Sequence, residues 1–250
     1  MQILRSALLS AFPHGFTTRG GGVSPAPWDS LNLGGSVGDE PSRVAENWRR
    51  LEAATRLHFA RVRQVHGARV VRIESPTGPV EEADAVVSAR AGVAACVSVA
   101  DCVPVLLADP DTGAVAAVHA GWRGTLAGVA RAAVDALARE VGAPPARLVA
   151  AIGPSIGPCC YEVSPDLAAR FQAELGSVVR DGAAPRLDLW DSNRRVLVAA
   201  GLAPDRVETL GRCTACTPTE FFSHRRDAGR TGRQVAFIGP PEPTAWGALP

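Results

Sequence analysis

The stretch SVADCVPVLLAD, residues 98–109, is an apolar run interrupted by one carboxylate and one thiol, at Asp101 and Cys102. Pro104 lacks an amide hydrogen and pushes Val103 toward an extended conformation, so the proline marks a boundary inside the run. The apolar residues on each side of this boundary are typical of buried strands. We therefore expect one strand to end and another to begin here, with Cys102 turned outward at the break. Side chains at strand ends are often presented to a crevice.

Strands and helices alternate on both sides of this stretch. The predicted strands are 60–73 (broken at His66 and Gly67), 91–100, 103–109, 113–121, 147–153 and 232–239. The predicted helices are one from about Pro41 with Asp39 as its cap, then 123–142, 164–175 and 192–200. Because several strands are adjacent in the chain, we expect a mixed α/β sheet structure with outer helices, in a single domain over 1–250. The Pro-rich segment 240–250 is expected to be irregular.

The composition is that of a globular protein. Apolar residues make up 46% of the 250 residues, charged residues make up 20%, and the net charge is +1, which favours neither nucleic acid nor membrane as a partner. No apolar run approaches the length of a transmembrane helix, and the short apolar patch at the start is not typical of a signal peptide. All 26 cationic residues are arginine, which excludes Schiff-base chemistry and a Walker phosphate loop. Six cysteines in a chain of this length predict reduced thiols in a cytoplasmic protein rather than a disulfide scaffold.

Three potential metal ligands stand at strand ends: His66 in QVHG, Cys102 in ADCVP and His119 in AVHAGWRG. Two imidazoles and one thiolate form a three-ligand zinc set that leaves a fourth position open for water or substrate. The alternative is that Cys102 is a small buried residue and His119 a hydrogen-bonded core histidine, and the residue pattern alone leaves both open. Because Asp101 would disfavour a thiolate beside it, a reactive Cys102 needs a positive neighbour such as a metal ion or Arg123.

Two arginines are candidates for anion binding. Arg19 stands beside three glycines in TTRGGGVS, whose amide groups can form a nest for phosphate. Arg123 lies at the start of a predicted helix, where anions are favoured. A flexible turn and two surface arginines are equally consistent with these patterns.

The other cysteines and the last histidine have no clear role in the sequence. Cys213 and Cys216 form a C-x-x-C pair in RCTAC, without a second such pair or a thioredoxin-like context. Cys159 and Cys160 in GPCCYEV either line the site or pack beside it. The segment FFSHRRD, which contains His224, predicts an exposed basic turn.

Taken in order, the motifs of this sequence closely resemble those of the YfiH family. The matching stretches are HGFTTRGGGVS, SLNLG, QVHG, DAVVS, ADCVPVLLAD, AVHAGWRGT, AIGPSIGPCCYEV, RCT and FFSHRRD with the following AGR and TGR. The resemblance implies a single domain of layered α/β/β/α type, similar to cytotoxic necrotizing factor, with its core at about 14–239. It implies a zinc-dependent purine nucleoside phosphorylase that acts on adenosine, inosine, guanosine and methylthioadenosine with phosphate, and that also deaminates adenosine.

The resemblance also assigns roles to individual residues. The family's metal ligands fall on the trio that the strand ends already indicate, His66, Cys102 and His119. Asp101 is then expected either to shuttle protons beside the metal or only to orient a metal ligand. Arg19 and Arg123 are expected to hold phosphate, and Asn32 to bind ribose or base. We expect zinc as the cofactor, with copper as an alternative, and a monomeric protein.

Three other functions would use the same residues. Copper-dependent phenol oxidation needs further ligands, and only His14, His58 and His224 would remain for a second copper cluster. A cysteine hydrolase, for example an amidase acting on peptidoglycan precursors, would use Cys102 as nucleophile and His119 as base. The third alternative is a metal-binding protein without catalytic activity. The sequence does not separate the hydrolase from the nucleoside enzyme.

Overall fold

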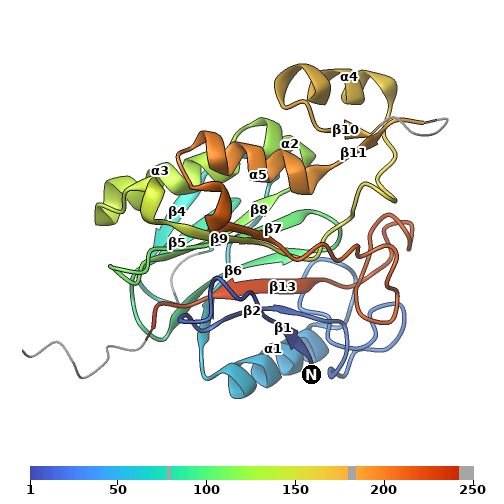
Figure 1. Ribbon diagram of the computed structural model, residues 1–250. Helices are drawn as coiled ribbons and strands as arrows, with labels where there is room; N and C mark the ends of the chain where they lie inside the picture. Colours follow the sequence, from blue (N-terminus) through green and yellow to red (C-terminus); the bar gives the residue numbers. More distant parts are fainter. Residues whose placement is uncertain (78–79, 180–183, 242–250) are drawn as a thin grey trace, which may run out of the picture.

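Two mixed β-sheets pack face to face, and helices cover both of their outer surfaces (Figure 1). The computed structural model describes residues 1–77, 80–179 and 184–241. The arrangement confirms the α/β/β/α layering that the sequence resemblance implies. Most of the segment 240–250 lies outside the described residues. Within the described ranges, no helix is both long enough and apolar enough to cross a lipid bilayer.

The two sheets each combine parallel and antiparallel pairs. In spatial order, the five-stranded sheet consists of β1 (Ile3–Leu4), β2 (His14–Thr17), β13 (Gln234–Ile238), β6 (Val93–Val99) and β3 (His58–Ala60). The six-stranded sheet consists of β12 (Val207–Thr209), β9 (Val149–Ile152), β7 (Val103–Ala108), β8 (Val115–Ala120), β5 (Ala85–Ser88) and β4 (Val70–Ile73). A separate hairpin pairs β10 (Val178–Val179) with β11 (Arg186–Leu187).

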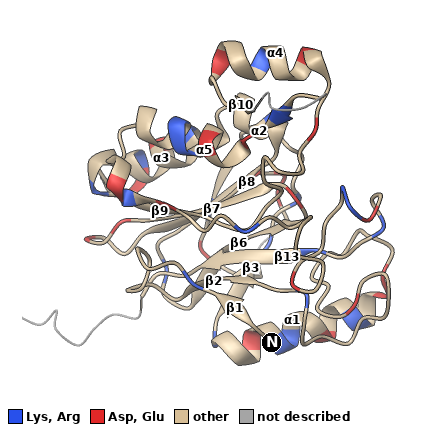
Figure 2. Cartoon of the chain, turned by 45° about the vertical axis from the view of Figure 1, so that its right-hand side comes forward, with Lys and Arg blue, Asp and Glu red and all other residues tan. Residues whose placement is uncertain are grey.

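The central strand β7 shows why the core has two layers. Every residue of this strand is buried, and its side chains alternate between the two faces of the sheet. Val105 and Leu107 join the cluster under the outer helices, whereas Leu106 and Ala108 join the cluster between the sheets. Figure 2 shows that β6, β7 and β8 carry no charged residue, while charged positions occur along the outer helices. The apolar runs of the sequence are therefore strands that are covered on both faces.

The described residues form five α-helices, four of which cover the two large sheets while α4 packs on β10 and β11. They are α1 (Pro41–Thr55), α2 (Trp122–Leu126), α3 (Val129–Val141), α4 (Pro165–Glu174) and α5 (Leu189–Ala199). Helix α1 packs on the five-stranded sheet through Val44, Trp48 and Leu51. The prediction that Asp39 caps this helix is wrong, because Glu40 occupies the cap position and Asp39 accepts hydrogen bonds from Ser24 and Asn32 instead.

The single helix expected over 123–142 is two helices. Gly128 has a φ of 77°, a left-handed conformation that interrupts the helical path between α2 and α3. The expected end at Gly142 is confirmed, because this residue also adopts the left-handed conformation and its N–H bonds to the Leu137 carbonyl. The break at Gly128 limits α2 to a short helix. This helix begins directly after β8.

The stretch 98–109 carries the chain from one sheet to the other. Strand β6 belongs to the five-stranded sheet and β7 to the six-stranded sheet, so residues 100–102 form the crossover. Asp101 has a φ of 84°, which turns the backbone sharply at this point. The predicted strand break before Val103 is confirmed, and Cys102 lies at the junction of the two sheets.

Beyond β7, an ion pair anchors the loop at the other end of the strand, and its charge makes stability depend on pH. The buried carboxylate of Asp109 accepts hydrogen bonds from Arg147 Nε at 2.5 Å, Arg147 Nη2 at 2.6 Å and Thr112 Oγ1 at 2.6 Å. Burial alone would raise the pKa of Asp109, but these bonds outweigh burial and hold its pKa below the usual value. The carboxylate therefore stabilises the fold fully above the unfolded-state pKa of about 4. This contribution is lost as the pH falls through the folded-state pKa.

We expect Asp109→Asn to lower the free energy of unfolding by about 2 kcal/mol at neutral pH. Urea unfolding at pH 7 and at progressively lower pH measures the effect, and the difference from wild type should shrink once the pH is below about 4. Asp111→Asn is the matched control, because the Asp111 side chain pairs with the same Arg147 but is 64% exposed. We expect the control to cost less than about 1 kcal/mol. A difference between Asp109→Asn and wild type that does not change with pH would contradict the prediction.

Candidate metal and substrate site

His66, Cys102 and His119 come together at one edge of the six-stranded sheet. Their ligand atoms lie within 4.8 Å of one another, and the two imidazole rings meet edge to face with centroids 4.8 Å apart. His119 is almost fully buried, Cys102 is partly buried and His66 is exposed. The sequence placed each of these residues at a strand end, and the structure brings those strand ends to a single point.

The local backbone fixes the three side chains. The antiparallel ladder pairs Val103 with Ala120 and Pro104 with His119, so Cys102 stands beside His119 at the start of β7. His66 precedes β4 and adopts a left-handed conformation with a φ of 61°, which reverses the chain toward the other two residues. Among the described residues of the site other than glycine, positive φ values occur at His66 before β4 and at Asp101 before β7. The first turn places His66 and the second places Cys102.

Asp84 holds His119 and the His66 turn in place, and the sequence-based prediction did not include it. Its fully buried carboxylate lies 2.8 Å from His119 Nδ1 and accepts hydrogen bonds from the amides of His66 at 2.9 Å and Gly67 at 2.7 Å. Burial alone would raise the pKa of Asp84, but the bonds from His119 and the two amides lower it. The residue therefore stays charged, holds His119 with Nε2 toward Cys102, and positions the His66 turn. An acid directly before a buried strand was the only signal of Asp84 in the sequence.

Cys102 and His119 form a charged pair within this framework. Burial raises the pKa of the Cys102 thiol, but the positive charges and hydrogen bonds of His119 and His66 outweigh burial and lower this pKa to about 6. Burial lowers the pKa of His119, but the Cys102 thiolate and Asp84 outweigh burial and raise it to about 9. The positive neighbour that a reactive Cys102 needs is therefore first of all His119, a histidine of the same site.

The three side chains fit a transition metal ion. A Cβ added at Gly121 would lie 2.9 Å from Cys102 Sγ and 3.3 Å from His66 Cδ2, so the glycine keeps the space beside the thiolate open. One thiolate and two imidazoles are a borderline-soft donor set that suits zinc or copper. Three protein ligands would leave a position for water or substrate on the cavity side.

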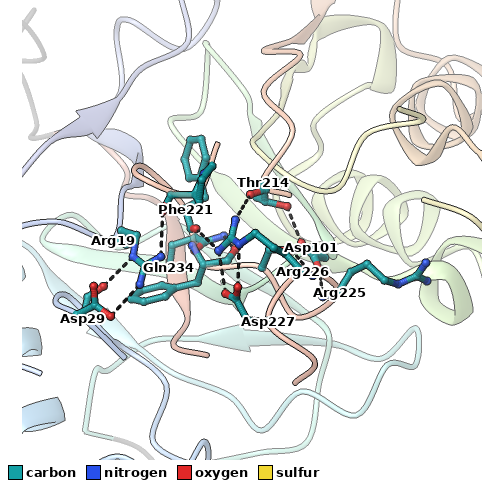
Figure 3. Close-up of polar contacts among 12 residues, drawn as sticks. Arg19, Asp29, Asp101, Thr214, Phe221, Arg225, Arg226, Asp227 and Gln234 are labelled. Atoms are coloured by element: carbon teal, nitrogen blue, oxygen red, sulfur yellow. Dashed lines mark hydrogen bonds and ion pairs between the residues drawn. The ribbon is translucent and has the colours of Figure 1, made fainter. Parts of the chain in front are cut away.

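Asp101, the predicted proton shuttle, has contacts that favour a positioning role. Its carboxylate accepts a hydrogen bond from Thr214 Oγ1 at 2.6 Å and one from the Arg225 amide at 2.6 Å (Figure 3). Its carbonyl oxygen also accepts from the Ile156 amide at 3.0 Å. Both carboxylate oxygens are thus engaged by the loops that surround the crossover, and Asp101 ties those loops to the base of Cys102.

The structure does not bring Arg19 or Asn32 to the cavity. Arg19 donates hydrogen bonds to Asp29 (Figure 3). It also donates to the Pro218 carbonyl, and its guanidinium lies over the Phe222 ring. Asn32 is fully buried, and its amide bonds to Gly34, Asp39 and the amide of Arg233. These contacts show that the polar groups of both residues hold the surrounding loops, and direct binding of phosphate and nucleoside by Arg19 and Asn32 stays a prediction.

A cavity of about 570 Å³ opens beside the three ligands. This volume is in the range of sites that take a small organic ligand. The aromatic residues of its wall are Trp48, Trp122 and Tyr161. The arginines of its wall are Arg61, Arg63, Arg123, Arg225 and Arg233. Among the described residues, Asp101 is the only acid that lines it, so the wall is strongly positive although the chain as a whole is nearly neutral.

Two of these arginines have the features of anion ligands. Arg123, the one predicted anion ligand that reaches the cavity, stacks on Trp122, and within the described residues its guanidinium has no hydrogen-bond acceptor. Arg233 is largely buried, which lowers the pKa of its guanidinium, while Cys102 and Asp101 act in the opposite direction. Arg233 and Arg225 were missed because they belong to distant loops, and FFSHRRD was interpreted as an exposed turn. The turn is confirmed, since His224 and Arg225 are exposed turn residues, and both of them also line the cavity wall.

Comparisons with known proteins agree with this geometry. The family model described as "Multi-copper polyphenol oxidoreductase laccase" matches residues 13–240. A Deinococcus radiodurans protein named "Purine nucleoside phosphorylase" is 45% identical over 247 residues, which cover 96% of this chain and 94% of that protein. The crystal structure of YlmD from Geobacillus stearothermophilus superposes with a TM-score of 0.91 at 35% identity and covers 97% of each chain. The crystal structure of YfiH from Bacillus licheniformis has a TM-score of 0.85 at 34% identity, covering 90% of this chain and 91% of that one.

Proposed function

The chain belongs to the multi-copper polyphenol oxidoreductase laccase family, the YfiH family that its motifs resemble, and from this premise we propose that it is a zinc-dependent purine nucleoside phosphorylase. The observation that carries the proposal is the cavity in which two histidines and a cysteine meet five arginines. The name of the Deinococcus radiodurans relative supports the reaction class. The proposed substrates are adenosine, inosine, guanosine and methylthioadenosine, each with phosphate.

The reaction balances as a displacement at the ribose. A phosphate oxygen attacks C1′ while the C1′–N9 bond breaks, and its electrons leave with the purine, which takes up a proton. The products are a free purine and ribose 1-phosphate. The arginine wall would hold the phosphate, because planar guanidinium groups bind phosphate oxygens in pairs. The aromatic wall would hold the base, and bringing the two reactants together lowers the entropic part of the barrier.

The metal-ligand trio would bind a zinc ion at the floor of this cavity. When bound, zinc supplies Lewis-acid polarisation of an oxygen that approaches it. Asp84 holds the His119 ring for this role, and Gly121 keeps the approach open. The same cavity would admit water in place of phosphate, and we extend the proposal to adenosine deamination, in which a water oxygen replaces the exocyclic amine to give inosine and ammonia.

The proposal includes the setting of the enzyme. All six cysteines are free, which suits a reducing, cytoplasmic location. Substrate and phosphate are small molecules, and a single chain supplies both the metal-ligand trio and the arginines of the cavity wall, so the proposed site requires no partner subunit. We therefore propose that the protein acts as a monomer.

Product analysis tests the proposed reaction. Zinc-loaded protein is incubated with adenosine or inosine, with and without phosphate, and the products are separated by chromatography. Adenine or hypoxanthine that forms only with phosphate, together with ribose 1-phosphate, supports phosphorolysis. Inosine from adenosine in both buffers supports deamination. Unchanged nucleosides with metal confirmed bound would overturn the proposal.

A cysteine hydrolase is the second candidate, because Cys102, His119 and Asp84 also have the arrangement of a nucleophile, a base and an orienting acid. In this function the Cys102 thiolate would attack the carbonyl carbon of an amide. Activity that survives chelation, together with covalent labelling of Cys102 by iodoacetamide in the metal-free protein, would favour it. Activity that disappears with the metal and returns with zinc would exclude it.

The donor groups of the chain fit a multinuclear copper enzyme poorly, despite the family's description. His14 is buried beside the amide of Ser6 and the carbonyl of Phe12, and His58 lies on the exposed edge of β3. Among the described residues, the candidate metal groups are the trio and a cluster of four cysteines, and neither offers a further set of histidines. Copper would therefore be a substitute at the trio rather than part of an oxidase cluster.

Arg123→Ala should weaken the use of phosphate. Because the Arg123 guanidinium lines the cavity with donors to spare, its removal should raise KM for phosphate by about 10-fold or more, with a smaller effect on KM for the nucleoside. Steady-state kinetics at varied phosphate measure this. Arg170→Ala is the control, since Arg170 lies on α4 in an exposed pair with Glu174. Equal changes in both KM values would show that Arg123 does not act on phosphate.

A further inference from the structure

We propose that Cys159, Cys160, Cys213 and Cys216 form a second metal site, which binds one structural zinc ion. The four sulfur atoms lie within 4.8 Å of one another, and all four thiols are free. Cys216 Sγ is 3.5 Å from Cys159 Sγ and 3.3 Å from Cys160 Sγ. This cluster is separate from the trio, and the catalytic proposal does not use it.

The spacing of the sulfurs matches a tetrahedral thiolate site. Zinc binds cysteine sulfur at about 2.3 Å, which places the sulfurs of a tetrahedral set about 3.8 Å apart. The cluster needs only small side-chain adjustments to reach that spacing. Four thiolates from a C-x-x-C pair and a second pair are a common composition for structural zinc, and they leave no position for a substrate.

The backbone around the cluster already supports a thiolate. The amide of Gly157 donates to Cys213 Sγ at 3.3 Å, a contact that stabilises negative charge on sulfur. The two cysteine-bearing segments are also joined by a β-bridge between Ser155 and Cys213, with the Thr214 amide donating to the Ser155 carbonyl at 3.0 Å. The cluster is therefore anchored by backbone contacts that do not depend on the metal.

Arginines surround these two segments. Arg226 donates to the Thr214 carbonyl at 2.8 Å, and Arg186 donates to the Cys159 carbonyl at 3.3 Å. Four thiolates around one zinc ion carry a net negative charge, and these guanidinium groups would offset it. Arg226 also pairs with the Asp227 carboxylate through Nε and Nη2, each at 2.8 Å, so only part of its charge acts on the cluster.

The position of the cluster gives the second zinc a role in shaping the cavity. One segment contributes Ile156 and Tyr161 to the cavity wall, and the other contributes Thr214, which holds the Asp101 carboxylate. A metal ion bound by both segments would fix the distance between them. We infer that it holds this side of the cavity in place while the trio performs the chemistry.

Metal analysis of the reduced, purified protein tests the site. Wild type loaded with zinc should contain about two zinc ions per chain, and Cys213→Ser/Cys216→Ser should contain about one. Cys96→Ser is the control, because Cys96 is a buried free cysteine outside both clusters and this variant should keep about two. One zinc ion in wild type, or an unchanged content in the double variant, would overturn the proposal.

A cobalt measurement keeps the test valid even if the double variant fails to fold. Cobalt-loaded Cys102→Ala should show the intense visible and charge-transfer bands of a four-thiolate tetrahedral site, because only the cysteine cluster then offers sulfur ligands. Zinc added afterwards should remove these bands. Their absence, a disulfide among the four cysteines in the reduced protein, or an iron–sulfur absorption in the isolated protein would overturn the assignment. None of these readouts depends on nucleoside cleavage, so failure here is distinct from failure of the proposed function.

Discussion

Cys102→Ala should reduce nucleoside cleavage by more than about 100-fold and remove the metal ion from the trio. Loss of an outer partner of a metal ligand typically costs 10- to 100-fold, and loss of the ligand itself should cost more. The two histidines that remain would be a weak site, because the thiolate contributes the softest donor and the only negative charge among the three. His119 would also lose one of the two neighbours that raise its pKa, so this pKa should fall while Asp84 still acts on the ring.

The measurement is kcat/KM for adenosine with phosphate, together with zinc content, for wild type and Cys102→Ala. Cys96→Ala is the matched control for metal binding, since this buried thiol donates to the Ala60 carbonyl and lines the cavity but lies outside the trio. The control should keep the zinc content of wild type. Full activity in Cys102→Ala would remove the trio from the proposed reaction, whichever metal is bound.

Asp84→Asn should lower both zinc affinity and kcat by about 10- to 100-fold. The asparagine has nearly the same shape, so the amides of His66 and Gly67 keep one acceptor. The charge that fixes the His119 ring is lost, and the amide group can present a donor to Nδ1, which would rotate the ring or favour the wrong tautomer. The effect should therefore be on the chemistry of His119 more than on the fold.

Competition with a chromophoric chelator measures the affinity, and thermal unfolding of the metal-free protein measures stability separately. Asp135→Asn on the exposed face of α3 is the control and should change neither quantity. A pH profile gives a further readout, because a purely structural role would lower kcat equally at every pH. An unchanged zinc affinity in Asp84→Asn would show that His119 is oriented without its carboxylate partner.

The strand break and the trio could be predicted because their signals are local. Pro104 and the apolar residues around Asp101 and Cys102 define the break within a few positions. His66 directly precedes Gly67, and His119 lies two residues before Gly121, each at the end of an apolar segment. Side chains at strand ends tend to share one edge of a sheet, so a local pattern was sufficient to suggest a common site.

Asp84, Arg225 and Arg233 could not be predicted with the same reasoning, because their roles depend on contacts between distant segments. Arg233 reaches the cavity only when β13 pairs with β6 in the middle of the five-stranded sheet. For Arg19, the local sequence pattern and the contacts in the structure point in different directions. Its glycine-rich surroundings look like an anion site, but contacts with Asp29 and Pro218 use its donors. The break at Gly128 could not be predicted either. The sequence shows a glycine within an apolar helical stripe, but it does not show whether φ at that glycine is positive or negative.

Because the crossover at residues 100–102 joins the two sheets, each sheet contributes a different part of the site. The trio and Asp84 all belong to the six-stranded sheet or to the turns next to it, and the β7–β8 ladder sets their spacing. Arg61 and Arg233 belong to the ends of β3 and β13 in the other sheet. Substitutions in the layer between the sheets can therefore resize the space for the substrate while the metal ligands keep their geometry. Such a protein can change its substrate during evolution while its metal site stays the same.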